Sequence, residues 1–109
     1  MMTEKLTNPT MKKLIEALNA GNQQAWNTLF TANAEFYDDG YRGDLKQFTA
    51  GAFGQGKERF SSIDKVENNG LHIYGRYHSH QWGNFQTYFK VRLDAIGKIT
   101  RLEVGQANY

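Results

Sequence analysis

The chain has 109 residues, of which 39% are hydrophobic and 14% aromatic, enough for one domain with one core. A formal net charge of +2 gives little reason to expect a polyanionic partner, and the lack of cysteine excludes disulfides and thiolate chemistry. No apolar signal-peptide core stands near the start, and no stretch approaches the ~20 apolar residues that span a bilayer. We therefore expect one cytoplasmic domain over residues 1–109, with residues 1–7 as a loose tail and no membrane partner.

Two helices are predicted after this tail. In the first, apolar residues recur at helical spacing, Asn8 and Pro9 provide the start, and Gly21 provides the stop. Its apolar stripe consists of Met11, Leu14, Ile15 and Leu18. Asn22 is placed to cap the second helix, whose expected apolar face comprises Trp26, Leu29 and Phe30. Because the linker is so short, the two helices are expected to lie close together.

The period changes to that of a strand near residue 34. Alternation gives this strand two faces, one with Ala34, Phe36 and Asp38 and the other with Glu35, Tyr37 and Asp39. Since Asp38 and Asp39 are adjacent, only one of them is expected to point inward. A turn or loop is predicted over residues 40–43, and Asp44 is placed to cap a third, shorter helix that the glycines after Phe53 end.

Strand patterns fill the rest of the chain, and turn signals such as Asn69-Gly70 separate them. The predicted strands cover residues 59–67, 71–81, 85–94 and 98–108. With helices first and strands later, the order α-α-β-α-β-β-β-β predicts an α+β fold. In it, a strongly curved antiparallel sheet wraps as a cone around three N-terminal helices. The conical space between sheet and helices is where a small ligand would bind.

Three motifs accompany this order. They are Ala17-Leu18-Asn19-Ala20-Gly21 closing the first helix, Leu29-Phe30 leading into Ala34-Glu35-Phe36-Tyr37-Asp38, and Gly97-Lys98-Ile99 opening the last strand. With them, residues 9–107 resemble the nuclear-transport-factor-2-like superfamily, which contains SnoaL-like cyclases and ketosteroid isomerases. The resemblance implies the cone-shaped fold. It implies no single activity, because the fold hosts isomerases, cyclases, dehydratases, hydrolases and non-catalytic proteins.

The resemblance also puts Asp38 where ketosteroid isomerases have their general base. Their oxyanion hole consists of a tyrosine and a protonated aspartic acid, and the similar positions here hold Leu14 and Phe89. Neither side chain donates a hydrogen bond to a developing enolate, so ketosteroid isomerase activity itself is not expected.

The sequence therefore predicts a SnoaL-like protein that binds a small apolar or mixed-polarity molecule. Asp38 is the candidate polar contact and acid or base for isomerase-, cyclase- or dehydratase-type chemistry; the alternative for this residue is an aspartate that closes a strand and accepts hydrogen bonds from turn amides. The candidate pocket residues are Trp26, Phe30, Phe36, Phe53, Phe89, Val91, Leu102, Val104 and Gln106. A different hypothesis is a non-catalytic dimerisation or protein-interaction module whose cavity is closed by aromatic side chains.

Three histidines, His72, His78 and His80, share one face of the predicted strand 71–81. The His-x-His pair, His78 and His80, would need at least a third ligand to hold a metal ion, and no nearby residue is an obvious one. No metal or cofactor is therefore expected. Two interpretations stay open: a polar stripe on the outside, or His78 or His80 at the mouth of the pocket. Apolar residues at the alternate positions favour outward histidines, although the turn at 82–84 leaves the register undecided.

Two further patterns are interpreted as structural. Residues 51–57 match the first seven positions of a phosphate-binding loop, but Glu58 stands where that loop needs Ser or Thr, and the preceding segment is helical in pattern. The basic residues of the last strands are interrupted by Asp94 and Glu103, which favours a solvated or dimer-contacting face over nucleic-acid binding. The outer sheet face predicted to form a homodimer contains Tyr74, Arg76, His78, Tyr88, Lys90 and Arg92.

Overall fold

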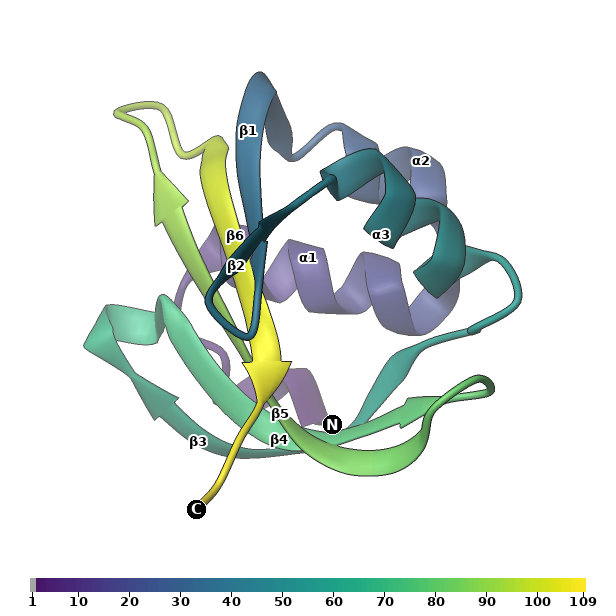
Figure 1. Cartoon of the computed structure of the whole chain (residues 1–109). Coiled ribbons are helices and arrows are strands. Elements are labelled where there is room, and N and C mark those ends of the chain that lie inside the picture. The colour runs from purple at the N-terminus through teal and green to yellow at the C-terminus, as the bar shows by residue number, and fades with distance from the viewer. Residues whose placement is uncertain (1) are drawn as a thin grey trace.

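The structure, a computed structural model, describes residues 2–109. A six-stranded sheet with the order β2-β1-β6-β5-β4-β3 curves around the helices, which lie on its concave side (Figure 1). The helices are α1 (Pro9–Ala20), α2 (Gln23–Asn27) and α3 (Leu45–Phe53). The strands are β1 (Phe30–Asp38), β2 (Tyr41–Gly43), β3 (Arg59–Glu67), β4 (His72–Ser79), β5 (Gly83–Leu93) and β6 (Ile99–Gln106). This architecture confirms the predicted α+β class with a curved sheet over three helices.

Helix α1 forms as its sequence predicts. The Asn8 side chain accepts a hydrogen bond from the Met11 amide at 3.0 Å, and Gly21 ends the helix with φ 68°, a conformation that glycine adopts without steric cost. The predicted apolar stripe is buried in the core. The short connection to α2 brings these two helices into contact, as expected.

Helix α2 is shorter than its apolar pattern suggests. It ends at Asn27, and Phe30 already begins β1, so the predicted helical face of Trp26, Leu29 and Phe30 is wrong beyond Trp26. Tertiary packing decides this boundary. The Trp26 ring is fully buried, its Nε1 donates to Thr49 Oγ1 at 3.0 Å, and the Ile99 amide donates to the Leu29 carbonyl, which holds the chain in the sheet.

The described part of the predicted tail is not loose. Residues Met2–Lys5 form a 3₁₀ turn, Leu6 is buried in the core, and Lys5 Nζ donates to the Ile63 carbonyl at 3.0 Å. Leu6 supplies the apolar contact that holds this segment against the rest of the chain. The apolar residues of this segment do not recur at a helical or strand period, so the sequence pattern predicted no element here.

Two features of the sheet differ from the simple antiparallel expectation. β1 pairs with β6 in parallel, because a long stretch of chain separates the two and allows them to run in the same direction. The segment predicted as a turn over residues 40–43 contains a short strand, β2, that pairs with the end of β1. Asp44 then caps α3, with Oδ1 accepting from the Lys46 amide at 2.8 Å, as predicted.

The curvature of the sheet has a local cause in β3 and β4. The register between them shifts at two places along β3, and extra residues at such bulges bend a strand. At Gly75 the strands approach so closely that an added Cβ would overlap the Ser62 carbonyl oxygen. A glycine is therefore required at this bend, and the sheet folds over the helices to make a concave face.

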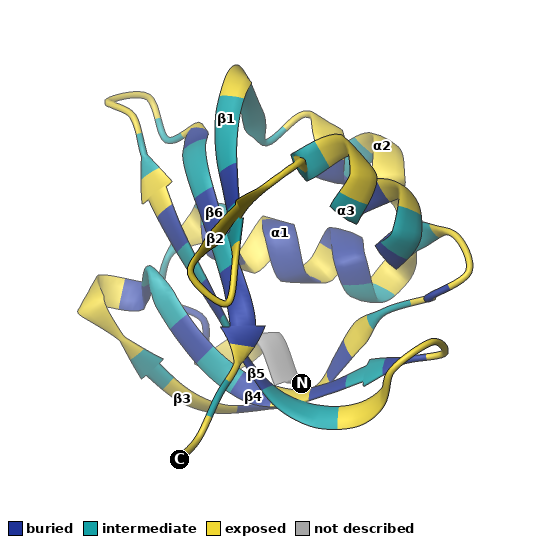
Figure 2. Ribbon diagram, viewed as in Figure 1, coloured by how far each residue is buried: buried dark blue, intermediate teal, exposed yellow. Residues whose placement is uncertain are grey.

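Alternation along the long strands decides what faces the core (Figure 2). In β5 the residues at odd positions from Phe85 to Leu93 face inward, as predicted, and in β4 the inward set contains Ile73, Tyr77 and Ser79. The histidines of β4 therefore lie on the outer face, the interpretation that the apolar alternate positions favoured. None of the helices within residues 2–109 is long and apolar enough to cross a membrane.

Candidate functional site

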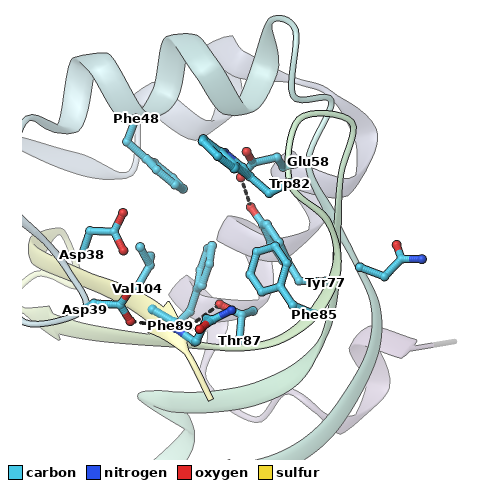
Figure 3. A pocket seen from close by; sticks show the side chains of 13 residues that line it. Asp38, Asp39, Phe48, Glu58, Tyr77, Trp82, Phe85, Thr87, Phe89 and Val104 are labelled. Carbon is cyan, nitrogen blue, oxygen red and sulfur yellow. Dashed lines mark hydrogen bonds between the residues drawn. The ribbon is translucent and has the colours of Figure 1, made fainter. Parts of the chain in front are cut away.

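The candidate site is a pocket of about 530 Å³ beyond the packed core, where the sheet extends past α3. Residues from α3, β1, β4, β5, β6 and the loops that follow β1, α3 and β4 line it (Figure 3). The lining residues are Asp38, Asp39, Phe48, Glu58, Tyr77, Trp82, Asn84, Phe85, Thr87, Phe89, Val104, Gly105 and Gln106. Aromatic rings and carboxylates dominate this set, the combination that gives a ligand site both apolar surface and orienting polar groups.

Asp38 is the last residue of β1, and its carboxylate points into the open space of the pocket (Figure 3). It stands two positions after the buried Phe36, on the same face of the strand. No described residue gives its side chain a hydrogen bond or an ion pair. Partial burial, and secondarily the negative charge of Asp39, raises the pKa of the Asp38 carboxyl above its ordinary value.

Asp39 is also among the residues that line the pocket, but its carboxylate lies beside the hydroxyl of Tyr88, a residue of the outer face. Strict alternation ends with β1: Asp39 has φ 50°, so its backbone leaves the extended conformation and its side chain turns back. Its Oδ1 accepts a hydrogen bond from the Gln106 amide at 2.9 Å. Gly105 makes room for this arrangement, since an added Cβ there would meet Asp39 Oδ1 and the Tyr88 hydroxyl oxygen at 2.5 Å.

The opposite wall carries a hydrogen-bonded group of three side chains, of which Figure 3 shows Tyr77 and Glu58. The Tyr77 hydroxyl donates to Glu58 Oε1 at 2.8 Å, and the Ser79 hydroxyl donates to Glu58 Oε2 at 3.2 Å. Burial, together with the negative charge and hydrogen bond of Glu58, raises the pKa of the Tyr77 phenol well above its ordinary value. The phenol is therefore neutral at physiological pH and directs its proton toward Glu58.

Sequence reasoning missed this wall. In the sequence Glu58 is notable only as the wrong residue for a phosphate-binding loop, and nothing in its immediate neighbourhood predicts that it faces Tyr77 and Ser79. The rejection of that loop agrees with the structure, because Gly51 and Phe53 belong to α3 and the chain then runs into β3 rather than into a second helix. One feature of the sequence could have indicated it. Tyr77 and Ser79 alternate with the outward residues of their strand, and their hydroxyl groups need a hydrogen-bond partner when they are buried.

The predicted pocket residues fall into three groups. Phe89, Val104 and Gln106 line the pocket together with Asp38. Phe36, Val91 and Leu102 share the inward parity but are buried within the core. Trp26 and Phe30 lie at a separate depression beside α2 and β1, and Phe53 lies at another beside the end of α1, so neither group joins Asp38. Phe48 and Phe85 were not predicted, because their patterns indicate core faces equally well.

The histidines of β4 and the turn after it contact neighbouring side chains. Within residues 2–109 no three potential ligands gather closely enough to hold an ion. His78 Nδ1 and Asn84 Oδ1 are 2.6 Å apart, and the rings of His78 and His80 meet edge to face with centroids 5.1 Å apart. His72 is partly buried, which lowers the pKa of its imidazole and favours the neutral ring.

Comparisons with known proteins identify the architecture. No protein-family model matches the sequence, and no curated protein is significantly similar to it. Solved structures match over nearly the whole chain, one being an NTF2-like protein of unknown function from Cytophaga hutchinsonii, with a TM-score of 0.69 and 19% identity over 93% of this chain and 89% of that one. The chain has the NTF2-like fold.

Other NTF2-like structures that match have names that refer to enzymes. A proposed polyketide cyclase from Sinorhizobium meliloti matches with a TM-score of 0.75 and 14% identity, covering 95% of this chain and 99% of that one. SalBIII, an epoxide hydrolase/cyclase-like enzyme with a role in pyran ring formation in the polyether salinomycin, matches with a TM-score of 0.68 and 14% identity, over 98% and 95% of the two chains. At such low identity these likenesses establish the shared fold, and activity has to be argued from the site.

Proposed function

We propose that this NTF2-like protein binds a small molecule of mixed polarity in the pocket. Asp38 is the main polar contact and the acid or base of an isomerase-, cyclase- or dehydratase-type reaction. One observation carries the proposal: an unpartnered carboxyl with a raised pKa that opens into a cavity of about 530 Å³. A raised pKa brings a carboxyl closer to the pH at which it exchanges protons with a substrate. The cyclase names of two structural neighbours support the reaction class.

The residues in and around the pocket limit the reactions that it can support. Leu14 and Phe89 are buried apolar residues, so no pair of neutral donors stands ready to stabilise an enolate as in a ketosteroid isomerase. The phenol of the pocket, Tyr77, directs its proton to Glu58. We therefore favour proton transfers at Asp38 in which the substrate itself delocalises the developing charge. The open pocket favours this function over a non-catalytic module closed by aromatic side chains.

A thermal-shift screen tests the proposal. Wild type and Asp38→Asn are heated with a library of small molecules that contains cations, neutral compounds and anions. We expect a subset to raise the melting temperature of wild type, and the Asp38→Asn variant to respond less to those with a polar group. If no compound stabilises either protein and a ligand-free crystal structure has the pocket filled by side chains, the proposed function is wrong.

We also propose a homodimer through the outer sheet face. Tyr74 and Tyr88 lie opposite each other on β4 and β5, and Lys90 Nζ lies 4.9 Å from the Tyr88 ring centroid. Tyr109 packs on Tyr74, with ring centroids 6.2 Å apart, so the C-terminal residue lies at this surface too. Such amphipathic side chains are common at interfaces.

Light scattering across a dilution series checks the homodimer. We expect about twice the 12.5 kDa chain mass. A clean monomer from ~100 to ~1 micromolar, a span of about 3 kcal/mol in association free energy, would refute the dimer.

A further inference from the structure

The charge of the pocket is unbalanced. Asp38, Asp39 and Glu58 line it, and none of the lining residues is a lysine, arginine or histidine. The whole chain has a formal net charge of +2, so this acidity is local. Ion pairs elsewhere in the described chain use Glu35 and Glu67, and none involves the three pocket carboxylates. The pocket therefore holds negative charge that the described residues leave without a basic partner.

The three carboxylates are not equally engaged. Asp39 accepts from the Gln106 amide, and Glu58 accepts from the hydroxyls of Tyr77 and Ser79. The Asp38 carboxylate has none of these donors, and it lies beside the negative charge of Asp39. A cation next to Asp38 would replace lost solvation and offset this repulsion. An anion would add to the repulsion.

The second observation is the aromatic wall, which does not depend on the acids. Phe48, Tyr77, Phe85 and Phe89 give ring surface to the pocket (Figure 3). Trp82, a large apolar residue that is 74% exposed, stands at the same pocket. The faces of aromatic rings attract cations, most strongly for tryptophan, and they also contact hydrocarbon. Rings do not coordinate a bare metal ion, so the wall favours an organic cation.

We propose that the pocket takes a small organic amine. Its ammonium group lies against Asp38, and its hydrocarbon part contacts the aromatic wall between Phe48 and Phe85. This inference rests on the proposed function and narrows its ligand class from mixed polarity to cationic. It also gives roles to two features that the acid-base argument does not use. Glu58 adds negative charge on the opposite wall, and the exposed Trp82 adds a ring face that attracts a cation.

Three probes of similar shape and different charge test the ligand class: phenethylamine, phenethyl alcohol and hydrocinnamate. Their dissociation constants are measured by titration calorimetry, or by NMR where binding is weak. For wild type we expect the amine to bind at least about tenfold more tightly than the alcohol, and hydrocinnamate to bind least, given Coulomb energies of charges at partly exposed sites. Raising the salt from about 50 to about 500 mM should narrow the gap between amine and alcohol, because salt screens charges.

Matched variants assign the effect to the pocket. Asp38→Asn and Glu58→Gln each remove one pocket charge with little change in shape, and the glutamine keeps an oxygen that accepts from Tyr77. Glu67→Gln removes the same charge from the exposed end of β3 and is the control. We expect Asp38→Asn to abolish most of the preference for the amine, because it should weaken binding of the amine much more than binding of the alcohol. Glu58→Gln should weaken the preference less, and Glu67→Gln should not change it. Circular dichroism confirms that each variant is folded.

The outcomes separate this inference from the proposed function. If the alcohol or hydrocinnamate binds as tightly as the amine, or if Asp38→Asn does not lower the preference for the amine, the amine inference is overturned and the binding function stands. The same holds if none of the three probes binds while neutral or anionic compounds of the thermal-shift library do. If no compound of any charge binds and a ligand-free crystal structure has the pocket filled by side chains, both proposals fail.

Discussion

The concave face of the sheet has two regions that follow the same alternation and differ in what lies opposite them. On β1, Phe36 is 4% exposed, whereas Asp38, two positions further on the same face, opens into the pocket. On β6, the fully buried Leu102 is followed at the same parity by Val104 and then by the exposed Gln106. Alternation along a strand decides which face of the sheet a side chain is on. Its position along the strand decides whether it is buried in the core or opens into the pocket.

The helices account for this difference. Phe36 stacks on Phe48 of α3 with ring centroids 4.7 Å apart, whereas Asp38 is separated from Phe48 by the pocket that both residues line. The Phe48 ring thus covers Phe36 on one side and borders the pocket in front of Asp38 on the other. Three pairs of substitutions test this contrast, and they are described from the largest expected effect to the smallest.

The largest effect is expected for truncating a ring in the packed region. Phe36→Ala should lower the free energy of unfolding by about 3–5 kcal/mol, because it leaves a cavity in a dry core. Phe85→Ala should cost less than about half as much, since Phe85 is partly exposed at the open pocket and water fills the space. Urea denaturation of both variants measures the difference. Equal losses would show that the pocket is as tightly packed in solution as the core.

An intermediate effect is expected at the turn that brings Asp39 to the pocket. Gly105→Ala should cost about 1–3 kcal/mol, because the added methyl group would overlap Asp39 Oδ1 and Tyr88. Gly51→Ala is the control. It lies within α3, and no neighbouring atom would contact an added methyl group there, so alanine should stabilise by about 0.5–1 kcal/mol. Thermal unfolding of the two variants tests the prediction, and a neutral Gly105→Ala would mean that Asp39 moves away freely.

The smallest effect is expected in how the stability of the fold depends on pH, which should differ between acids on the two faces of β1. The folded-state pKa of Asp38 is raised, so its ionisation destabilises the fold as pH rises above 3.8 through the folded value. Asp38→Asn should therefore stabilise at neutral pH, by no more than about 0.5 kcal/mol at this partly exposed site, and the gain should vanish below pH 3.8. Urea titrations at several pH values measure it.

Glu35, on the outer face of the same strand, should behave in the opposite way. Its carboxylate accepts from Arg101 Nε at 2.8 Å, and this hydrogen bond lowers the pKa of Glu35. Its contribution is present above the ordinary value of 4.5 and is lost as pH falls through the folded pKa. Glu35→Gln should thus destabilise at neutral pH and match wild type in acid. The same sign for both variants would contradict the assignment of the two faces.

The sequence by itself determined much of the secondary structure. Helix α1, from the cap at Asn8 to the stop at Gly21, and strand β3 have the predicted bounds, and β5 has the predicted inner and outer faces. These features depend on local chemistry: capping side chains, a glycine at positive φ, and a strict period of two. Such signals act within a few residues and need no knowledge of the rest of the chain.

Tertiary structure alone decided the composition of the pocket. Val91 and Val104 have similar side chains and both face inward, yet only Val104 reaches the pocket, because depth depends on where the helices end. Asp39 joins Asp38 through a backbone turn at φ 50°, and Glu58 comes from the loop between α3 and β3, where its amide donates to the Ala52 carbonyl. Contacts between residues far apart in the chain leave no local period, so the sequence pattern did not contain them.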